Sequence, residues 1–223
     1  LYLTCLHFGL VHGQTDSIQL LESVHVESIR QTANQIGSKN LQIDSLVLAR
    51  NPGTNLGEIL ARESPIFTKS YGSGALATTS FRGGSAAHTS VLWGGIPINS
   101  PTNGQLDFSL IPTSFFNEAA ISFGGGSALW GSGAIGGSIH MVRSLPYNED
   151  FIVNVNSQVG SFGRFGNQAS VEFSTKKYSG FVGTSIQVAQ NNFDLVNIET
   201  EENIGKQTNS QFNQQSIYTE HKV

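Results

Sequence analysis

From residue 151 onward the chain alternates between apolar and polar residues with a period of two, which predicts β-strands. The runs cover residues 151–159, 168–174 and 178–188, and a fourth begins at Ser216. The polar faces are rich in amides and hydroxyls and poor in charge, as expected for a barrel with an apolar exterior and a wet interior. In the first run the apolar face carries Phe151, Val153, Val155 and Val159, and the polar face carries Asn154, Asn156 and Gln158.

The connections between these runs differ in length. Residues 175–177 predict a tight turn, whereas residues 191–211 form a long polar stretch. Short turns at one end and long loops at the other are typical of barrels in the outer membrane. If the first strand rises from the periplasm, residues 161–166 and 191–211 lie outside and Lys176 and Lys177 lie inside.

The middle of the chain has a different pattern. Asn55 precedes apolar residues at helical spacing, Leu56, Ile59 and Leu60, which predicts a short capped helix. Glycine-rich turns separate strand-like pieces at 78–81, 89–93 and 119–123. We therefore expect a small mixed domain over residues 41–143, joined by a polar connector to the strands of 151–223.

Residues 1–14 are apolar and end in small and polar residues, which is typical of a signal-peptide remnant. The alternative is the start of a buried strand or helix. Cys5 is the only cysteine, so a mature chain that begins after it contains no disulfide. Residues 15–40 are then a polar N-terminal segment.

Composition excludes several classes of function. Charged residues make up 13% of the chain, the net charge is −4, and no basic run is present, so we expect no nucleic-acid binding. The six histidines have no metal-ligand spacing, and no nucleophile has an identifiable base, so we predict no catalytic residue, no metal, no cofactor and no enzyme activity. The GxGxxG at residues 131–136 precedes a strand-like segment, which argues against a dinucleotide site.

Four blocks between about Leu20 and Arg143 resemble the plug domain of TonB-dependent receptors, and most of all the outer-membrane cobalamin receptors. Two departures concern the salt bridges between plug and barrel: Leu92–Gly95 lacks the family's acidic residue, and Ala120 and Phe123 replace an acid and an arginine. The blocks read NLGEIL (55–60), TTSFRGGSAAHTSVLWGG (78–95), PINSPTNGQLDFSLIP (97–112) and GGGSALWGSGAIGGSIHMV (124–142).

The resemblance implies an α+β fold, with a small mixed plug domain followed by the first antiparallel strands of a transmembrane β-barrel. Because a plugged barrel has about 22 strands, the chain would be a fragment. The implied function is TonB-dependent transport of a large, scarce substrate across the cell outer membrane, with a corrinoid such as cobalamin or an iron siderophore as the small molecule. The implied partners are TonB and outer-membrane lipid. The alternative is a secreted Gly-rich β adhesin or surface structural protein.

The resemblance also implies site residues. Outward-facing plug loops are expected to bind substrate through Tyr71, Gly72, Ser73, Gly74, Asn99, Ser100 and Asn103, with residues 191–211 closing the site from the barrel side. Arg82 is the expected cation for docking of the plug to the barrel. The TonB-box candidate is Glu22, Ser23, Val24, His25 and Val26, an alternating segment that would add as a strand to the partner's sheet. Its alternative is an ordinary first strand of the plug.

Overall fold

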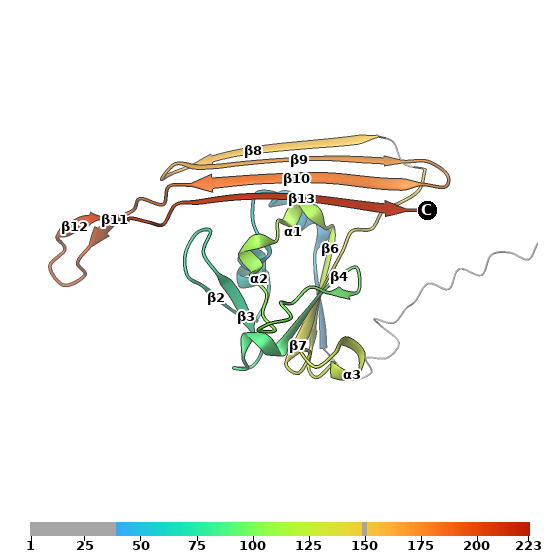
Figure 1. Ribbon diagram of the computed structural model, residues 1–223, viewed down its shortest axis with the longest axis horizontal. Helices are drawn as coiled ribbons and strands as arrows, with labels where there is room; N and C mark the ends of the chain where they lie inside the picture. Colours follow the sequence, from blue (N-terminus) through green and yellow to red (C-terminus); the bar gives the residue numbers. More distant parts are fainter. Residues whose placement is uncertain (1–38, 149–150) are drawn as a thin grey trace, which may run out of the picture. The chain divides into compact units, whose positions relative to one another are not determined.

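The computed structural model describes residues 39–148 and 151–223, which form two main sheets that follow one another along the chain (Figure 1). The expected signal remnant and the TonB-box candidate lie outside the described residues. Among the described helices, none is long and apolar enough to cross a membrane.

The first sheet has five strands in the order β1-β6-β7-β4-β5, and only the pairing of β4 with β7 is parallel. The strands expected at 89–93 and 119–123 are confirmed as β4 and β6, and the strand expected at 78–81 pairs with β2 in a separate hairpin. The bounds are β1 Lys39–Ile43, β2 Phe67–Ser70, β3 Ala77–Ser80, β4 Thr89–Trp93, β5 Ile96–Pro97, β6 Glu118–Phe123 and β7 Gly137–Val142.

The predicted capped helix is confirmed as α2 (Leu56–Glu63). The side-chain oxygen of Asn55 accepts a hydrogen bond from the backbone N–H of Glu58 at 2.9 Å, which satisfies one of the unpaired donors of the first turn. The other helices are short: α1 Ser45–Arg50, α3 Ser127–Trp130, and the 3-10 helices η1 Ala86–His88, η2 Phe108–Leu110 and η3 Thr113–Phe115.

This mixed domain has its own hydrophobic core. Leu56, Ile59 and Leu60 of α2 are fully buried and pack in one cluster with Ile121 of β6 and Ile139 of β7. Each such side chain contributes about 1.5–3 kcal/mol of stabilisation. The core therefore fixes the base from which the β2–β3 hairpin projects.

The second sheet is antiparallel, with the order β13-β10-β9-β8. Its bounds are β8 Ile152–Gly160, β9 Arg164–Ser174, β10 Ser179–Ala189 and β13 Phe212–Lys222. The predicted two faces are confirmed, because Ser185 and Gln187 are buried while Val155 and Ile217 are 68% and 73% exposed.

Three details of the last zone differ from the prediction. The second strand, β9, begins at Arg164 rather than at residue 168, so the connection expected at 161–166 is a turn of residues 161–163. The fourth strand begins at Phe212 rather than at Ser216, and the long polar stretch contains a small hairpin of β11 (Asp194–Val196) and β12 (Asn203–Lys206). Neither short strand alternates clearly, and all of their residues are exposed, so the period-two signal was missing there.

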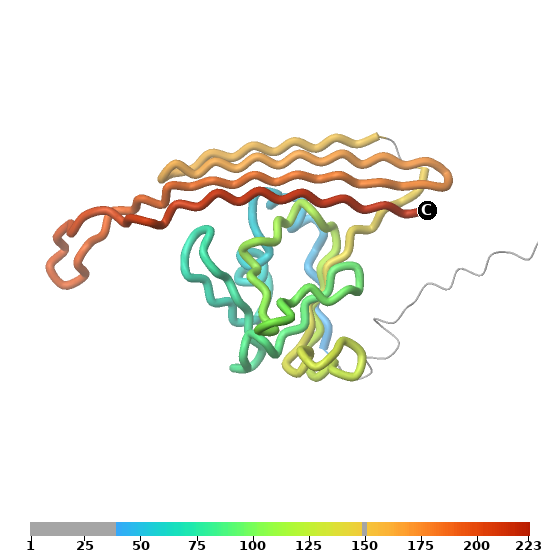
Figure 2. Tube along the Cα trace, viewed as in Figure 1, coloured from blue at the N-terminus to red at the C-terminus, as the bar shows by residue number. Residues whose placement is uncertain are grey.

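The turn after β8 and the long connection after β10 lie at the same end of the second sheet, and the turn at residues 175–178 lies at the other end (Figure 2). The rings of Phe162 and Phe193 meet edge to face at 4.5 Å between centroids, which joins the two connections. The two connections predicted to lie outside therefore share one end of the sheet, and Lys176 and Lys177 lie at the other end, as predicted.

Candidate functional site

The turn between β2 and β3 forms the first wall of the candidate site. Its backbone closes through the N–H of Tyr71, which donates to the carbonyl of Leu76 at 3.1 Å. Gly72 and Gly74 have φ values of 128° and 72°, which residues with a side chain rarely adopt. The ring of Tyr71 is 60% exposed at this turn.

The connection between β10 and β13 forms the second wall and is held to the turn by Asn191. This residue is buried, and its Nδ2 donates to the carbonyl of Ser73 at 2.8 Å and to that of Ser210 at 2.9 Å. The hydroxyl of Ser210 donates back to the carbonyl of Asn191 at 2.7 Å. One amide therefore ties the β2–β3 turn to both ends of the long connection.

A second contact explains why a glycine stands in the turn. A Cβ built on Gly74 would lie 2.2 Å from Cδ1 of Phe212, well inside van der Waals contact. The ring of Phe212 thus lies directly on the backbone of the turn, and no side chain fits at residue 74.

These two walls line a cavity of about 540 Å³ that is open to the outside. Among the described residues that line it, none carries a formal charge: they offer amides, hydroxyls, backbone groups and aromatic rings. Such a surface can hydrogen-bond and stack on a neutral polar ligand. The lining includes Tyr71, Ser73, Phe193, Gln207, Asn209 and Gln211.

The structure brings together only the first group of predicted substrate residues. Tyr71, Gly72, Ser73 and Gly74 line the cavity, together with the predicted barrel-side stretch, whereas Asn99, Ser100 and Asn103 do not. The side chain of Asn99 is engaged in its own loop, where it accepts from the N–H of Val91 and donates to the carbonyls of Thr89 and Gly104. A role for this second group in substrate binding stays a prediction.

Sequence reasoning placed Asn191 at the start of the long loop without giving it a role, and it did not single out Phe212, which follows the loop. The first has a positive φ of 51°, a conformation in which Asn is enriched, and an Asn pair at 191–192 was the available signal. The contact of Phe212 with Gly74 depends on packing between distant segments and has no local signal.

The mixed domain and the second sheet are joined by an ion pair that sequence reasoning missed. Nη2 of Arg143, just after β7, lies 2.5 Å from Oε1 of Glu172 in β9. The guanidinium also lies over the ring of Phe181 at 3.6 Å from its centroid. Burial lowers the pKa of Arg143, and the charge of Glu172 opposes this shift. The predicted docking cation, Arg82, is exposed and has no ion pair within residues 39–148 and 151–223, so its role stays a prediction.

Aromatic residues reinforce this junction. Nε1 of Trp93 donates to the hydroxyl of Tyr218 at 2.8 Å, and that hydroxyl donates to Oε2 of Glu220 at 2.5 Å. The ring of Phe115 stacks on that of Tyr218 at 5.8 Å between centroids. The end of β4 is therefore fixed against β13.

The mixed domain contains a buried histidine, His140. His140 of β7 is buried beneath Trp130, with its Nε2 2.8 Å from the hydroxyl of Ser138. Burial lowers the pKa of His140 below 6.5. Within the described part of the chain, no group of His, Cys, Asp or Glu side chains is arranged to hold a metal ion.

Comparison with known proteins supplies the family context. The family model described as the TonB-dependent receptor plug domain matches residues 23–138. The vitamin B12 transporter BtuB of Vibrio vulnificus is 34% identical over 122 residues, covering 49% of this chain and 20% of that protein. BtuB of Photobacterium profundum is 31% identical over 109 residues, covering 49% of this chain and 18% of that protein. The chain thus spans about a fifth of the length of these relatives.

Solved structures show the same fold at low sequence identity. The ferric yersiniabactin uptake receptor FyuA of Yersinia pestis matches with a TM-score of 0.55 and 20% identity, over 75% of this chain and 27% of that one. A complex of Pseudomonas aeruginosa FpvA with a heterologous pyoverdine matches with a TM-score of 0.59 and 17% identity, over 70% of this chain and 21% of that one. A plug domain followed by barrel strands, as expected from the sequence, is confirmed.

Proposed function

Because this chain belongs to the TonB-dependent receptors, a family of outer-membrane proteins, we propose that it acts in the energised uptake of a large neutral ligand across the outer membrane. The observation that carries the proposal is the cavity of about 540 Å³ between the β2–β3 turn and the β10–β13 connection. A ligand held there touches plug and barrel at once, so binding and movement of the plug are linked.

The chemistry of the cavity favours a corrinoid over an anionic iron chelate. A corrinoid such as cyanocobalamin carries several primary carboxamides around a broad ring, and the lining offers amides, hydroxyls and aromatic rings without a cation. An anionic chelate is best matched by Arg or Lys, which pair with carboxylates. The names of the two BtuB relatives point to the same ligand.

Energy would come from the partner TonB through the N-terminal segment. Residues Glu22–Val26 alternate in sequence, so an extended backbone there can add to the edge of a partner sheet while its side chains stay loosely specified. In this proposal, pulling on that segment loosens the plug. Asn99, Ser100 and Asn103 would contact the ligand after such a movement, and Arg82 would dock against barrel strands other than β8, β9, β10 and β13.

The test is calorimetric titration of cyanocobalamin into the full-length protein in detergent, with two matched variants. Tyr71→Ala removes an exposed ring that lines the cavity, whereas Phe67→Ala removes a ring of similar exposure, 65% against 60%, on the same hairpin but outside the cavity. We expect the first to lose about tenfold in affinity, the loss of one stacking contact with the ligand, and the second to bind as wild type.

Equal affinities of the two variants would refute this cavity as the ligand site. Absence of binding by the folded wild-type protein would refute the corrinoid, and a panel of ferric siderophores then tests the other substrate class.

A further inference from the structure

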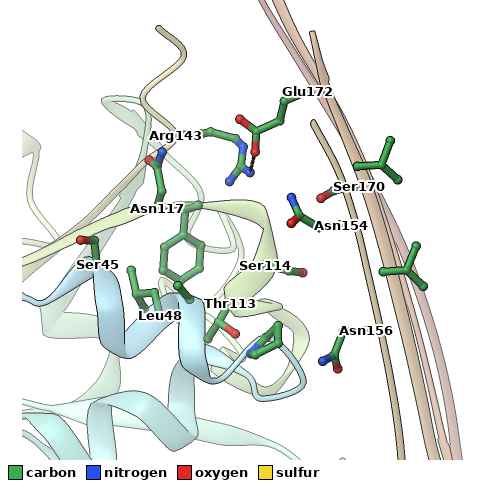
Figure 3. Close-up of a pocket in the computed structure, with 15 residues that line it drawn as sticks. Ser45, Leu48, Thr113, Ser114, Asn117, Arg143, Asn154, Asn156, Ser170 and Glu172 are labelled. Carbon is green, nitrogen blue, oxygen red and sulfur yellow. Dashed lines mark hydrogen bonds and ion pairs between the residues drawn. The ribbon is translucent and has the colours of Figure 1, made fainter. Parts of the chain in front are cut away.

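A second cavity, of about 500 Å³, lies between the plug and the inner face of the second sheet (Figure 3). Asn154, Ser170 and Glu172 project from β8 and β9 toward α1 and η3, and Ser114 faces them from the plug. No described residue lines both this cavity and the candidate ligand site, so the two are separate.

Three buried polar atoms among the residues that line this cavity have no hydrogen-bond partner within the described part of the chain. They are Nε of Arg143, the hydroxyl of Ser114 and Oδ1 of Asn156. The side chain of Arg143 is only 7% exposed. Buried polar groups are nearly always paired in native proteins, so three such atoms around one cavity leave positions there for a polar partner.

The charges decide what kind of group fits. The cation and the carboxylate of the cavity, Arg143 and Glu172, are paired with each other, and the other lining residues are uncharged. A charged ligand group would therefore lose hydration without gaining an unpaired counter-charge. A neutral group is favoured.

The unpaired atoms also require a ligand group that both donates and accepts hydrogen bonds. Nε of Arg143 can only donate, Oδ1 of Asn156 can only accept, and the hydroxyl of Ser114 does either. A primary carboxamide has a carbonyl oxygen that accepts and an NH₂ group that donates. It is thus a neutral group that can pair with each of these kinds of atom.

We propose that this cavity is a second, transient binding site for a carboxamide-bearing ligand, occupied as the ligand passes between the plug and the barrel wall. The proposal rests on the proposed uptake function, and it adds a place inside the barrel where the ligand's amide side chains exchange water for Arg143, Ser114 and Asn156. Binding there is weaker than at the outer site, because the ligand must leave it again.

A photo-crosslinking experiment tests occupancy directly. A small diazirine amino acid is placed at residue 154, which lines the cavity, or at residue 159, which lies on the opposite face of β8, is 86% exposed and does not line the cavity. Cells producing each full-length variant take up cyanocobalamin under illumination, and adducts are detected by mass spectrometry. We expect a cobalamin adduct at 154, none at 159, and loss of the adduct when a protonophore removes the proton gradient.

Uptake at the wild-type rate with no adduct at 154 above that at 159 would overturn the proposal. Failure of the proposed function has a different signature, since the unmodified protein would then neither bind nor take up cyanocobalamin.

A pair of substitutions gives a second readout. Asn156→Leu keeps the size of the side chain but removes its hydrogen-bonding groups, and Ser157→Ala alters the neighbouring residue on the opposite face. We expect Asn156→Leu to slow uptake on the order of tenfold, the effect of one unmade buried hydrogen bond, with unchanged affinity at the outer site. Equal uptake rates for the two variants would contradict the proposal.

Discussion

The ion pair between Arg143 and Glu172 gives the sharpest prediction about how the plug is held. Arg143→Met leaves the carboxylate of Glu172, which is 21% exposed, without its partner. Removing one partner of a buried pair costs about 3–5 kcal/mol, and the remaining exposure of Glu172 favours the lower end. The contact with the ring of Phe181 adds about 1–2 kcal/mol. We therefore expect a loss of roughly 4 kcal/mol.

The double variant Arg143→Met with Glu172→Leu separates the cost of an orphaned charge from the value of the pair. Replacing both partners by apolar residues is often nearly neutral, so the double variant should be more stable than Arg143→Met alone. Hydrogen exchange of the β7 amides in the full-length protein in detergent measures the free energy of opening. Arg50→Met, at an exposed residue of α1 that has no ion pair within residues 39–148 and 151–223, is the control. If the two changes simply add, the account of this junction is wrong.

Four further predictions follow from single contacts. Gly74→Ala should weaken ligand binding by about tenfold, because a residue with a side chain is strained by about 1–2 kcal/mol at a φ of 72°. Calorimetry measures the affinity, and wild-type affinity would refute the close packing of the turn. Tyr218→Phe leaves Nε1 of Trp93 unpaired and should destabilise the plug by about 1–3 kcal/mol, measured by hydrogen exchange; an unchanged opening energy would contradict this. Val155→Lys puts a charge on the exposed apolar face and should lower the folding stability by about 2–4 kcal/mol if the residue lies near the bilayer centre. Gel mobility of unheated samples reports the folded fraction, and full folding would argue against contact with lipid. His140 has a folded-state pKa below 6.5, so its contribution to stability is present above about pH 6.5 and is lost as the pH falls below that value; urea unfolding at two pH values should show this loss, and His140→Gln should abolish it.

The elements that the sequence predicted well are those with a strong local signal. The cap of α2 is a side-chain contact over three residues, and the strands β8, β9 and β10 alternate between apolar and polar residues over most of their length. In both cases the residues that set the structure are close together in the chain, so a pattern along the sequence is enough.

The contacts that sequence reasoning missed join distant segments. Arg143 and Glu172 are 29 residues apart, and Trp93 and Tyr218 are 125 apart. Each pair depends on how the plug sits against the second sheet, which no local pattern specifies. The family resemblance directed attention to Arg82 because it lies within a recognised block, whereas Arg143 stands just beyond the last one.

Only part of the candidate site could be predicted, because the contact that assembles it also joins distant segments. The Gly-rich turn at residues 72–74 and the long polar stretch were each visible alone, and their pairing was inferred from the family resemblance. The link itself, the amide of Asn191 bound to the carbonyl of Ser73, involves a backbone group that every residue carries. Only the fold reveals which one is used.

Energised uptake is the central claim, and accumulation of radiolabelled cyanocobalamin tests it most directly. The full-length protein is produced in cells that lack their own corrinoid transporter, with and without a protonophore and with and without TonB. The account predicts accumulation that requires both the proton gradient and TonB and that falls with Tyr71→Ala but not with Phe67→Ala. Accumulation that is independent of TonB, or its absence in cells whose protein binds cyanocobalamin at the surface, would contradict the claim.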